Sequence, residues 1–125
     1  MVELPDGAVE TLLAEDPGGP VVMLNLLRFR PEGGRETYQR YVDAVGAVSA
    51  RYGVEIVYLG EGGRALAAED GQAWDTVLLV RYPSREHFAA MIRDPAYREI
   101  EHLRVEGLAE AVLQPTVPAI GREVA

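Results

Sequence analysis

The sequence contains no cysteine and no lysine. The absence of cysteine excludes disulfide bonds, thiolate metal sites and cysteine nucleophiles, and the absence of lysine excludes Schiff-base and lysine general-base chemistry. The apolar runs are too short for a membrane-spanning helix, and the first residues lack the basic and apolar segments of a signal peptide. These absences lead us to expect a cytoplasmic protein.

Basic side chains are also few. Twelve arginines stand against 20 acidic residues, so that the net charge is −8. Nucleic acids and anionic membranes bind basic surfaces, and we therefore expect neither as a partner. Hydrophobic residues make up 48% and charged residues 26% of the chain, which is typical of a globular protein. The 125 residues suit a single domain over 1–125.

The most continuous apolar stretch is Val21–Phe29. Its length and composition predict a strand that is buried on both faces. Asn25 interrupts this strand with a single amide, and Arg28 and Phe29 close it. A buried amide needs a hydrogen-bond partner, which a protein group, a water molecule or a ligand can supply.

The rest of the chain predicts alternating helices and strands. Apolar residues at helical spacing predict a short helix at 5–15 and a longer one at 35–52, which Gly53 ends. Ser84 and Asp94 are suited to cap two further helices, the second over about 95–106. Strands are expected at 20–29, 54–61, 73–82 and 108–116. The core then spans 20–116, and residues 117–125 are expected to form an extended arm.

The expected order is an extra N-terminal helix followed by βαββαβ. This is an α+β ferredoxin-like sandwich, a four-stranded antiparallel sheet with helices on one face. Both faces of the first strand are apolar, so a single copy would expose a large apolar surface. We therefore expect a homodimer with the two sheets face to face, in a dimeric α/β barrel. The purely aliphatic set Val22, Leu24 and Leu26 suits the helix side, which assigns Asn25 to the barrel interior.

Several short motifs, in this order, resemble domain-of-unknown-function family 1330 of the dimeric α/β-barrel superfamily. They are Met23–Phe29, Tyr38-Gln39-Arg40-Tyr41, Trp74-Asp75, Arg81-Tyr82-Pro83-Ser84, Asp94-Pro95-Ala96-Tyr97 and Arg104. The resemblance extends over roughly 20–115 and implies a dimer with a small cavity in each subunit. The superfamily includes cofactor-free monooxygenases, lactone isomerases, dehydrating enzymes, haem-degrading enzymes and ligand-binding modules. The family itself implies no particular one of these activities.

Four residues are candidates for catalysis. Asn25 can orient a carbonyl or hydroxyl group, and a structural bond to a neighbouring strand or a water is the alternative. Asp75, His102 and Arg104 can supply proton transfer or charge. Asp75 needs burial to act as a base, and an ion pair with an arginine is its alternative role.

Four further residues are candidates for ligand binding. Trp74 and Tyr82 can form walls of a pocket, Tyr97 can offer a hydroxyl, and Arg28 can hold a carboxylate. The alternatives are core packing or dimer contact for the aromatic residues and ordinary ion pairing for Arg28. We expect no metal and no cofactor, because cysteine and the usual histidine spacings are missing. A haem on His102 is a lesser alternative.

The leading hypothesis is a small dimeric enzyme of the monooxygenase or isomerase type. It would act without a cofactor on a compact, mostly apolar molecule with one or two oxygen groups. The alternative is a non-catalytic module that binds a small ligand or only dimerises. An enzyme should pair Asn25 with a titratable group in an open cavity. A structural barrel should instead be filled by side chains, with Asn25 bonded to backbone.

Overall fold

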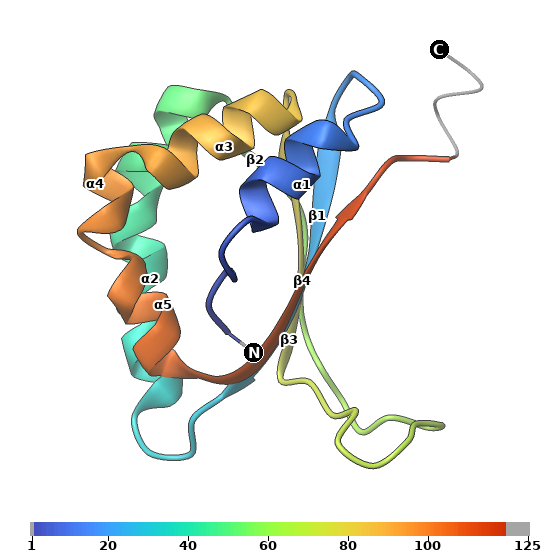
Figure 1. Cartoon of the computed structure of the whole chain (residues 1–125). Coiled ribbons are helices and arrows are strands. Elements are labelled where there is room, and N and C mark those ends of the chain that lie inside the picture. The colour runs from blue at the N-terminus through green and yellow to red at the C-terminus, as the bar shows by residue number, and fades with distance from the viewer. Residues whose placement is uncertain (1, 120–125) are drawn as a thin grey trace.

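The computed structural model describes residues 2–119 and shows one sheet with helices on a single face (Figure 1). The elements are α1 (Ala8–Ala14), β1 (Val21–Phe29), α2 (Gly34–Ser49), a 3₁₀ turn η1 (Ala50–Tyr52), β2 (Glu55–Glu61), β3 (Thr76–Tyr82), α3 (Arg85–Arg93), α4 (Pro95–Arg98), α5 (Glu101–Gly107) and β4 (Leu108–Thr116). The strands lie in the order β2-β3-β1-β4, with every neighbouring pair antiparallel. The predicted ferredoxin-like fold with an extra N-terminal helix is confirmed. Of the arm predicted at 117–125, residues 120–125 lie outside the described residues.

The helix ends follow the local chemistry of the sequence. The Ser84 hydroxyl accepts a hydrogen bond from the His87 N–H at 3.1 Å, and the Asp94 carboxylate accepts one from the Ala96 N–H at 2.8 Å. Both capping predictions are therefore confirmed. Gly53 has a φ of 67°, a left-handed conformation that glycine adopts without strain, and it ends the helical segment as predicted.

Three predicted boundaries differ from the structure. The helix expected at 95–106 is divided into α4 and α5, because the Ile100 and Leu103 N–H groups donate to carbonyls three residues back instead of four. The helix expected at 5–15 begins only at Ala8, because Gly7 before it has a φ of 85°. The third strand begins at Thr76 and not at 73, since 73–75 belong to the preceding loop.

The two faces of β1 are the reverse of the sequence assignment. Val21, Met23, Asn25 and Leu27 are buried, whereas the aliphatic residues between them are partly exposed. Val21 and Met23 pack in one core with residues of α2 and α3, and Leu27 packs against Tyr38 of α2. Asn25 therefore faces the helices, and the aliphatic set Val22, Leu24 and Leu26 lies on the other face. The prediction that the purely aliphatic set faces the helices was wrong, because α2 and α4 place tyrosine hydroxyls on the helix side.

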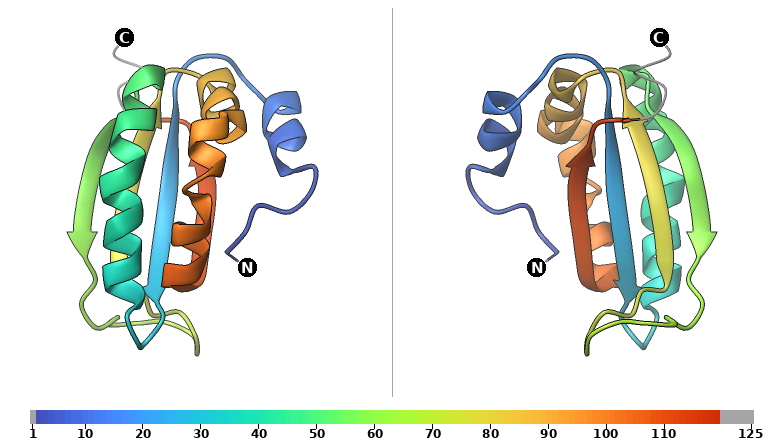
Figure 2. Two further views of the ribbon diagram at one scale, coloured as in Figure 1. Left: turned by 90° about the vertical axis from the view of Figure 1, so that its left-hand side faces the viewer. Right: turned by 90° about the vertical axis from the view of Figure 1, so that its right-hand side faces the viewer.

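The face of the sheet without helices is called the open face here. Its apolar residues come from all four strands: Val22, Leu24, Leu26, Tyr58, Val77, Leu79 and Val112. Strand β2 is an edge strand that extends beyond the helices (Figure 2). Its residues Ile56, Val57, Tyr58 and Leu59 are each more than half exposed, at 59%, 51%, 54% and 62%. Within residues 2–119, no helix is long and apolar enough to cross a bilayer.

Candidate functional site

Four tyrosines meet between the sheet and the helices, and we call them the tyrosine cluster. Tyr38 and Tyr41 lie three residues apart on one side of α2, Tyr97 comes from α4, and Tyr82 ends β3. The rings of Tyr38 and Tyr41 are 5.4 Å apart, and those of Tyr41 and Tyr97 are 6.3 Å apart. The hydroxyls of Tyr41 and Tyr97 share a hydrogen bond of 3.0 Å. The hydroxyls of Tyr38 and Tyr82 have no such partner within residues 2–119.

Arg104 reaches the same region from α5. Its Nη1 atom donates a hydrogen bond of 2.9 Å to the backbone carbonyl of Val2. Its Nη2 atom is buried and has no hydrogen-bond partner among residues 2–119. Nor does any carboxylate in that part of the chain form an ion pair with Arg104. A buried cationic donor without an acceptor is unfavourable, so this atom is a candidate donor to a ligand.

Burial keeps the tyrosine cluster protonated. It raises the pKa of Tyr38 to about 12 and raises the pKa of Tyr41, Tyr82 and Tyr97 as well, while the charge of Arg104 lowers all four pKa values and only partly offsets burial. At neutral pH the four hydroxyls are therefore neutral hydrogen-bond donors, and none is a counter-ion for Arg104. No aspartate, glutamate or histidine within residues 2–119 is buried, so this interior has no general base.

The raised tyrosine pKa values predict a loss of stability in alkali. Tyrosine ionises near pH 10 in the unfolded chain but only near pH 12 at Tyr38, so rising pH favours unfolding across this interval. Tyr38 alone accounts for roughly 2–3 kcal/mol of that loss. Circular dichroism and tyrosinate absorbance should therefore change together in one transition between these pH values. Tyr38→Phe should reduce the loss, and titration of all tyrosines near pH 10 with the fold intact would contradict this prediction.

Asn25 lies on the same side of the sheet and is 7% exposed. Its Nδ2 atom donates to the backbone carbonyl of Met23, at a long 3.4 Å. Asn25 is absent from the walls of both clefts described below. The amide therefore has a backbone partner and no titratable one, which is the arrangement expected of a structural barrel.

The N-terminal segment closes the side of the sandwich between β4 and the helices (Figures 1 and 2). One cleft of about 560 Å³ lies between residues 2–10 and α3–α5, and Tyr97 and Arg104 are part of its wall. A second cleft of about 440 Å³ lies on the sheet side of this segment, where Met23 and Phe88 line it. We call residues 2–7 the N-terminal strap. Residues 3–7 of the strap are exposed, whereas Val2 packs against the core around Leu27.

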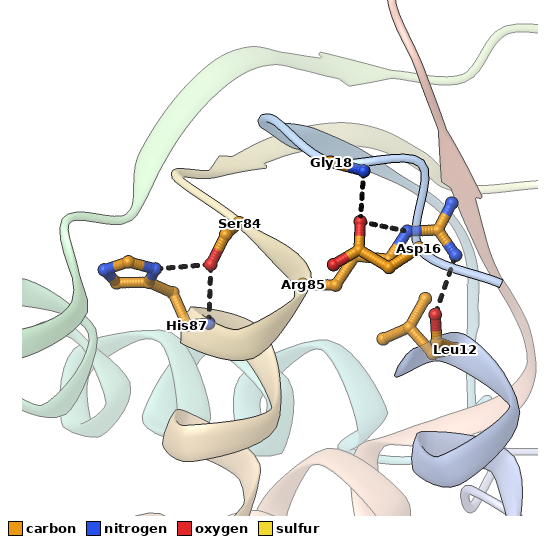
Figure 3. A network of polar contacts seen from close by, with 6 residues as sticks. All are labelled: Leu12, Asp16, Gly18, Ser84, Arg85 and His87. Atoms are coloured by element: carbon orange, nitrogen blue, oxygen red, sulfur yellow. Dashed lines mark hydrogen bonds and ion pairs between the residues drawn. The ribbon is translucent and has the colours of Figure 1, made fainter. Parts of the chain in front are cut away.

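Arg85 fixes the far end of α1 (Figure 3). The buried guanidinium donates to the Leu12 carbonyl at 3.0 Å and lies 3.9 Å from the Asp16 carboxylate. The same carboxylate accepts the Gly18 N–H at 2.8 Å. Helix α1 is therefore clamped at its C-terminal end, and Arg104 holds the start of the strap. This clamp was not predicted, because a single arginine after a helix cap gives no signal of a distant partner.

Arg28 and Trp74 form a separate cluster on the open face. The Arg28 guanidinium lies 5.3 Å from the centre of the Trp74 ring and forms an ion pair with Glu110. It also donates to the carbonyls of Gly71 and Ala73, at 3.0 and 2.8 Å. Trp74 precedes β3, whereas Tyr82 ends it, so the two predicted pocket walls lie at opposite ends of one strand. Arg28 is already paired, and this cluster fastens the loop before β3 to the sheet.

Asp75 and His102 also lie outside the tyrosine cluster. The Asp75 carboxylate accepts the Phe29 N–H at 2.9 Å and so closes the end of β1. The alternative role considered for Asp75, an ion pair with an arginine, is also absent within residues 2–119. The His102 side chain is 60% exposed, 3.8 Å from Glu106, at the rim of the larger cleft. Of the eight candidate residues, the structure brings together Tyr82, Tyr97 and Arg104, with Asn25 on the same side of the sheet.

The strand order and the helices on one face define an α+β protein of the ferredoxin-like class. A solved protein of unknown function from Rhodopseudomonas palustris, RPA0582, is 32% identical, over 94% of this chain and 95% of that chain, with a TM-score of 0.88. A dimeric ferredoxin-like protein from Thermobifida fusca is 16% identical over 82% of this chain and 93% of that one, with a TM-score of 0.55. A candidate antibiotic biosynthesis monooxygenase from Bacteroides thetaiotaomicron is 21% identical over 81% and 90%, with a TM-score of 0.57. The last two likenesses show the fold alone.

Residues 33–114 match the profile of the family described as Domain of unknown function (DUF1330). The chain belongs to this family, as the motifs predicted. The match begins after β1, so the motif Met23–Phe29 lies outside it. No match was found among curated proteins.

Proposed function

We propose that this chain forms a homodimer that binds a small, mostly apolar molecule with one or two oxygen groups. The ligand would lie between the sheet and the helices, at the tyrosine cluster. The observation that carries this proposal is the Nη2 atom of Arg104, which is buried without an acceptor among residues 2–119. The hydroxyls of Tyr38 and Tyr82 lie close enough for the charge of Arg104 to lower their pKa values, and they have no hydrogen-bond partner in that part of the chain. Aromatic and aliphatic walls around a few converging polar groups are typical of small-ligand sites.

The proposal of a homodimer is based on the apolar surface of the open face. Seven apolar side chains from four strands line a surface that no helix of residues 2–119 covers. Ferredoxin-like proteins of the same fold from Bacteroides fragilis and Thermobifida fusca are described as dimeric. A symmetric pair that buries both open faces would remove this apolar surface from water.

An enzyme of the cofactor-free monooxygenase or isomerase type is the second candidate. It is favoured by the neutral tyrosine hydroxyls beside a cation, a combination that stabilises an oxyanion such as an enolate. It is opposed by the lack of a buried base within residues 2–119 and by the backbone bond of Asn25. A substrate for this site would therefore have to be acidic enough to lose its proton without a buried carboxylate or imidazole. Turnover of any compound that binds would favour this second candidate.

A thermal-shift screen of phenols, quinones, lactones and short carboxylates tests the proposed function. A ligand at about 100 times its Kd should raise the melting temperature by roughly 5–10 °C. Tyr82→Phe removes a hydroxyl that has no partner among residues 2–119, so the free variant should keep its stability while the ligand-induced shift becomes smaller. Tyr58→Phe, on the open face and away from the tyrosine cluster, is the matched control and should keep the full shift. If no compound of any class shifts the wild-type protein, the ligand proposal is wrong.

A further inference from the structure

The contact between Arg104 and Val2 joins the unpaired donor to the N-terminal strap. One terminal nitrogen of the guanidinium, Nη1, donates to a neutral backbone carbonyl, and the other, Nη2, has no acceptor within residues 2–119. Both nitrogens belong to one planar fork that matches the two oxygens of a carboxylate. The Val2 carbonyl therefore pairs with one of the two nitrogens that a carboxylate could engage together.

We propose that the ligand is a monocarboxylate, and that its carboxylate displaces the Val2 carbonyl from Arg104 when it binds. This inference rests on the proposed function and names the ligand class and the gate of the same site. An ionised acceptor forms a hydrogen bond about twice as strong as a neutral carbonyl does, so a carboxylate competes successfully with Val2. The protonated tyrosine hydroxyls can donate to whichever carboxylate oxygen lies nearest to them, and the rings contact the apolar body.

The strap is mostly exposed to solvent. Residues 3–7 are exposed and border the larger cleft, and the next fixed points along the chain are Val9, which packs against the core, and Glu10, which pairs with Arg93. Val2 is the anchor, through its carbonyl on Arg104 and its side chain against the core around Leu27. Because Nη2 is buried while Val2 is in place, a ligand gains access to it when the strap lifts.

Charge elsewhere in the chain does not replace this contact. The net charge of −8 repels anions at long range, and salt at physiological strength screens that repulsion beyond about 8 Å. Glu101, one turn before Arg104 on α5, is close enough to raise the pKa of Tyr97, and Glu3, Asp6, Glu10 and Glu106 line the same cleft. A carboxylate therefore binds only by direct contact with the guanidinium, which makes Arg104 the residue to test.

Pairs of a carboxylic acid and its amide test whether the site prefers a carboxylate, and this preference is separate from the ability to bind a ligand at all. Calorimetry would compare acetate with acetamide, benzoate with benzamide, and cinnamate with cinnamamide, at neutral pH and up to millimolar concentration. At least one carboxylate should bind the wild type about tenfold more tightly than its amide or better, a difference of about 1.4 kcal/mol. Arg104→Gln should abolish this preference. Arg98→Gln, which removes the same charge from an exposed position lining the same cleft, should keep it.

A loosened strap tests the displacement. Val2→Ser weakens the apolar anchor of the strap without shortening the chain and should tighten carboxylate binding by roughly threefold to tenfold. Glu3→Ser is the matched control and should leave the affinity unchanged, because Glu3 is exposed. Equal binding of acid and amide, a preference that survives Arg104→Gln, or weaker binding in Val2→Ser would each overturn the inference. Phenols or lactones that bind without any preference for carboxylates would overturn it while leaving the proposed function in place, whereas the absence of any ligand would remove both.

Discussion

Leu24→Arg is expected to convert the proposed dimer into monomers. Leu24 lies in the middle of the open face, directly between Leu79 of β3 and Gln114 of β4. In a symmetric interface each substitution occurs twice, so two cations would approach each other in an apolar contact. Like charges in such a contact cost several kcal/mol, which raises the dissociation constant by at least about 100-fold.

Light scattering or sedimentation at micromolar protein concentration measures this effect. Val42→Arg is the matched control, because Val42 lies on α2, away from the open face, and is already 39% exposed. It makes the same change of side chain and should leave the dimer intact. A wild-type protein that is already monomeric at micromolar concentration would overturn the argument from the open face.

Gly107→Ala should lower the free energy of unfolding by about 3 kcal/mol. Gly107 ends α5 where it meets the first turn of α2, and the two backbones touch. A Cβ atom at Gly107 would lie 2.9 Å from the carbonyl oxygen of Gly34 and 2.9 Å from the amide nitrogen of Tyr38. Both contacts are with backbone, which cannot move aside as a side chain can. The helices would have to separate, and the tyrosine cluster would be disturbed with them.

A second glycine-to-alanine substitution, at Gly46, is a control that should change stability in the opposite direction. A Cβ atom at Gly46, in the interior of α2, would meet no atom within 4 Å. Gly46→Ala should therefore stabilise the protein by up to about 1 kcal/mol, because alanine favours the helix. Urea unfolding at one fixed protein concentration measures both variants, since a dimer's stability depends on concentration. Equal stability of Gly107→Ala and wild type would show that α2 and α5 are not tightly joined.

The order of the elements could be predicted because it follows from patterns of a few neighbouring residues. Helical spacing at 35–52 and the caps at Ser84 and Asp94 act over a few residues, and each is confirmed. The assignment of the two faces of β1 could not be made in this way. Alternation separates the residues into two sets, but when both sets are apolar it does not say which one the helices cover. That choice depends on tertiary packing against the tyrosines of α2 and α4.

The site was predictable only in part, for a related reason. Tyr82, Tyr97 and Arg104 were proposed from their residue types, and the fold brings them together. Asp75 was proposed in the same way, but it closes the end of a strand. The partner of Arg104 is the Val2 carbonyl, 102 residues away. A backbone acceptor cannot be recognised from residue type, since every residue has a backbone carbonyl.

That backbone acceptor has a consequence for how the strap can vary among relatives. Substitution at Val2 changes the side chain that anchors the strap but always leaves a carbonyl for Arg104. This carbonyl is placed by the number of residues between it and α1, which the packing of Val9, the Glu10–Arg93 ion pair and the Arg85 clamp hold in position. An inserted or deleted residue in this interval would shift the register and move the carbonyl away from the guanidinium. The length of the N-terminal segment, more than its composition, therefore determines whether Arg104 is covered.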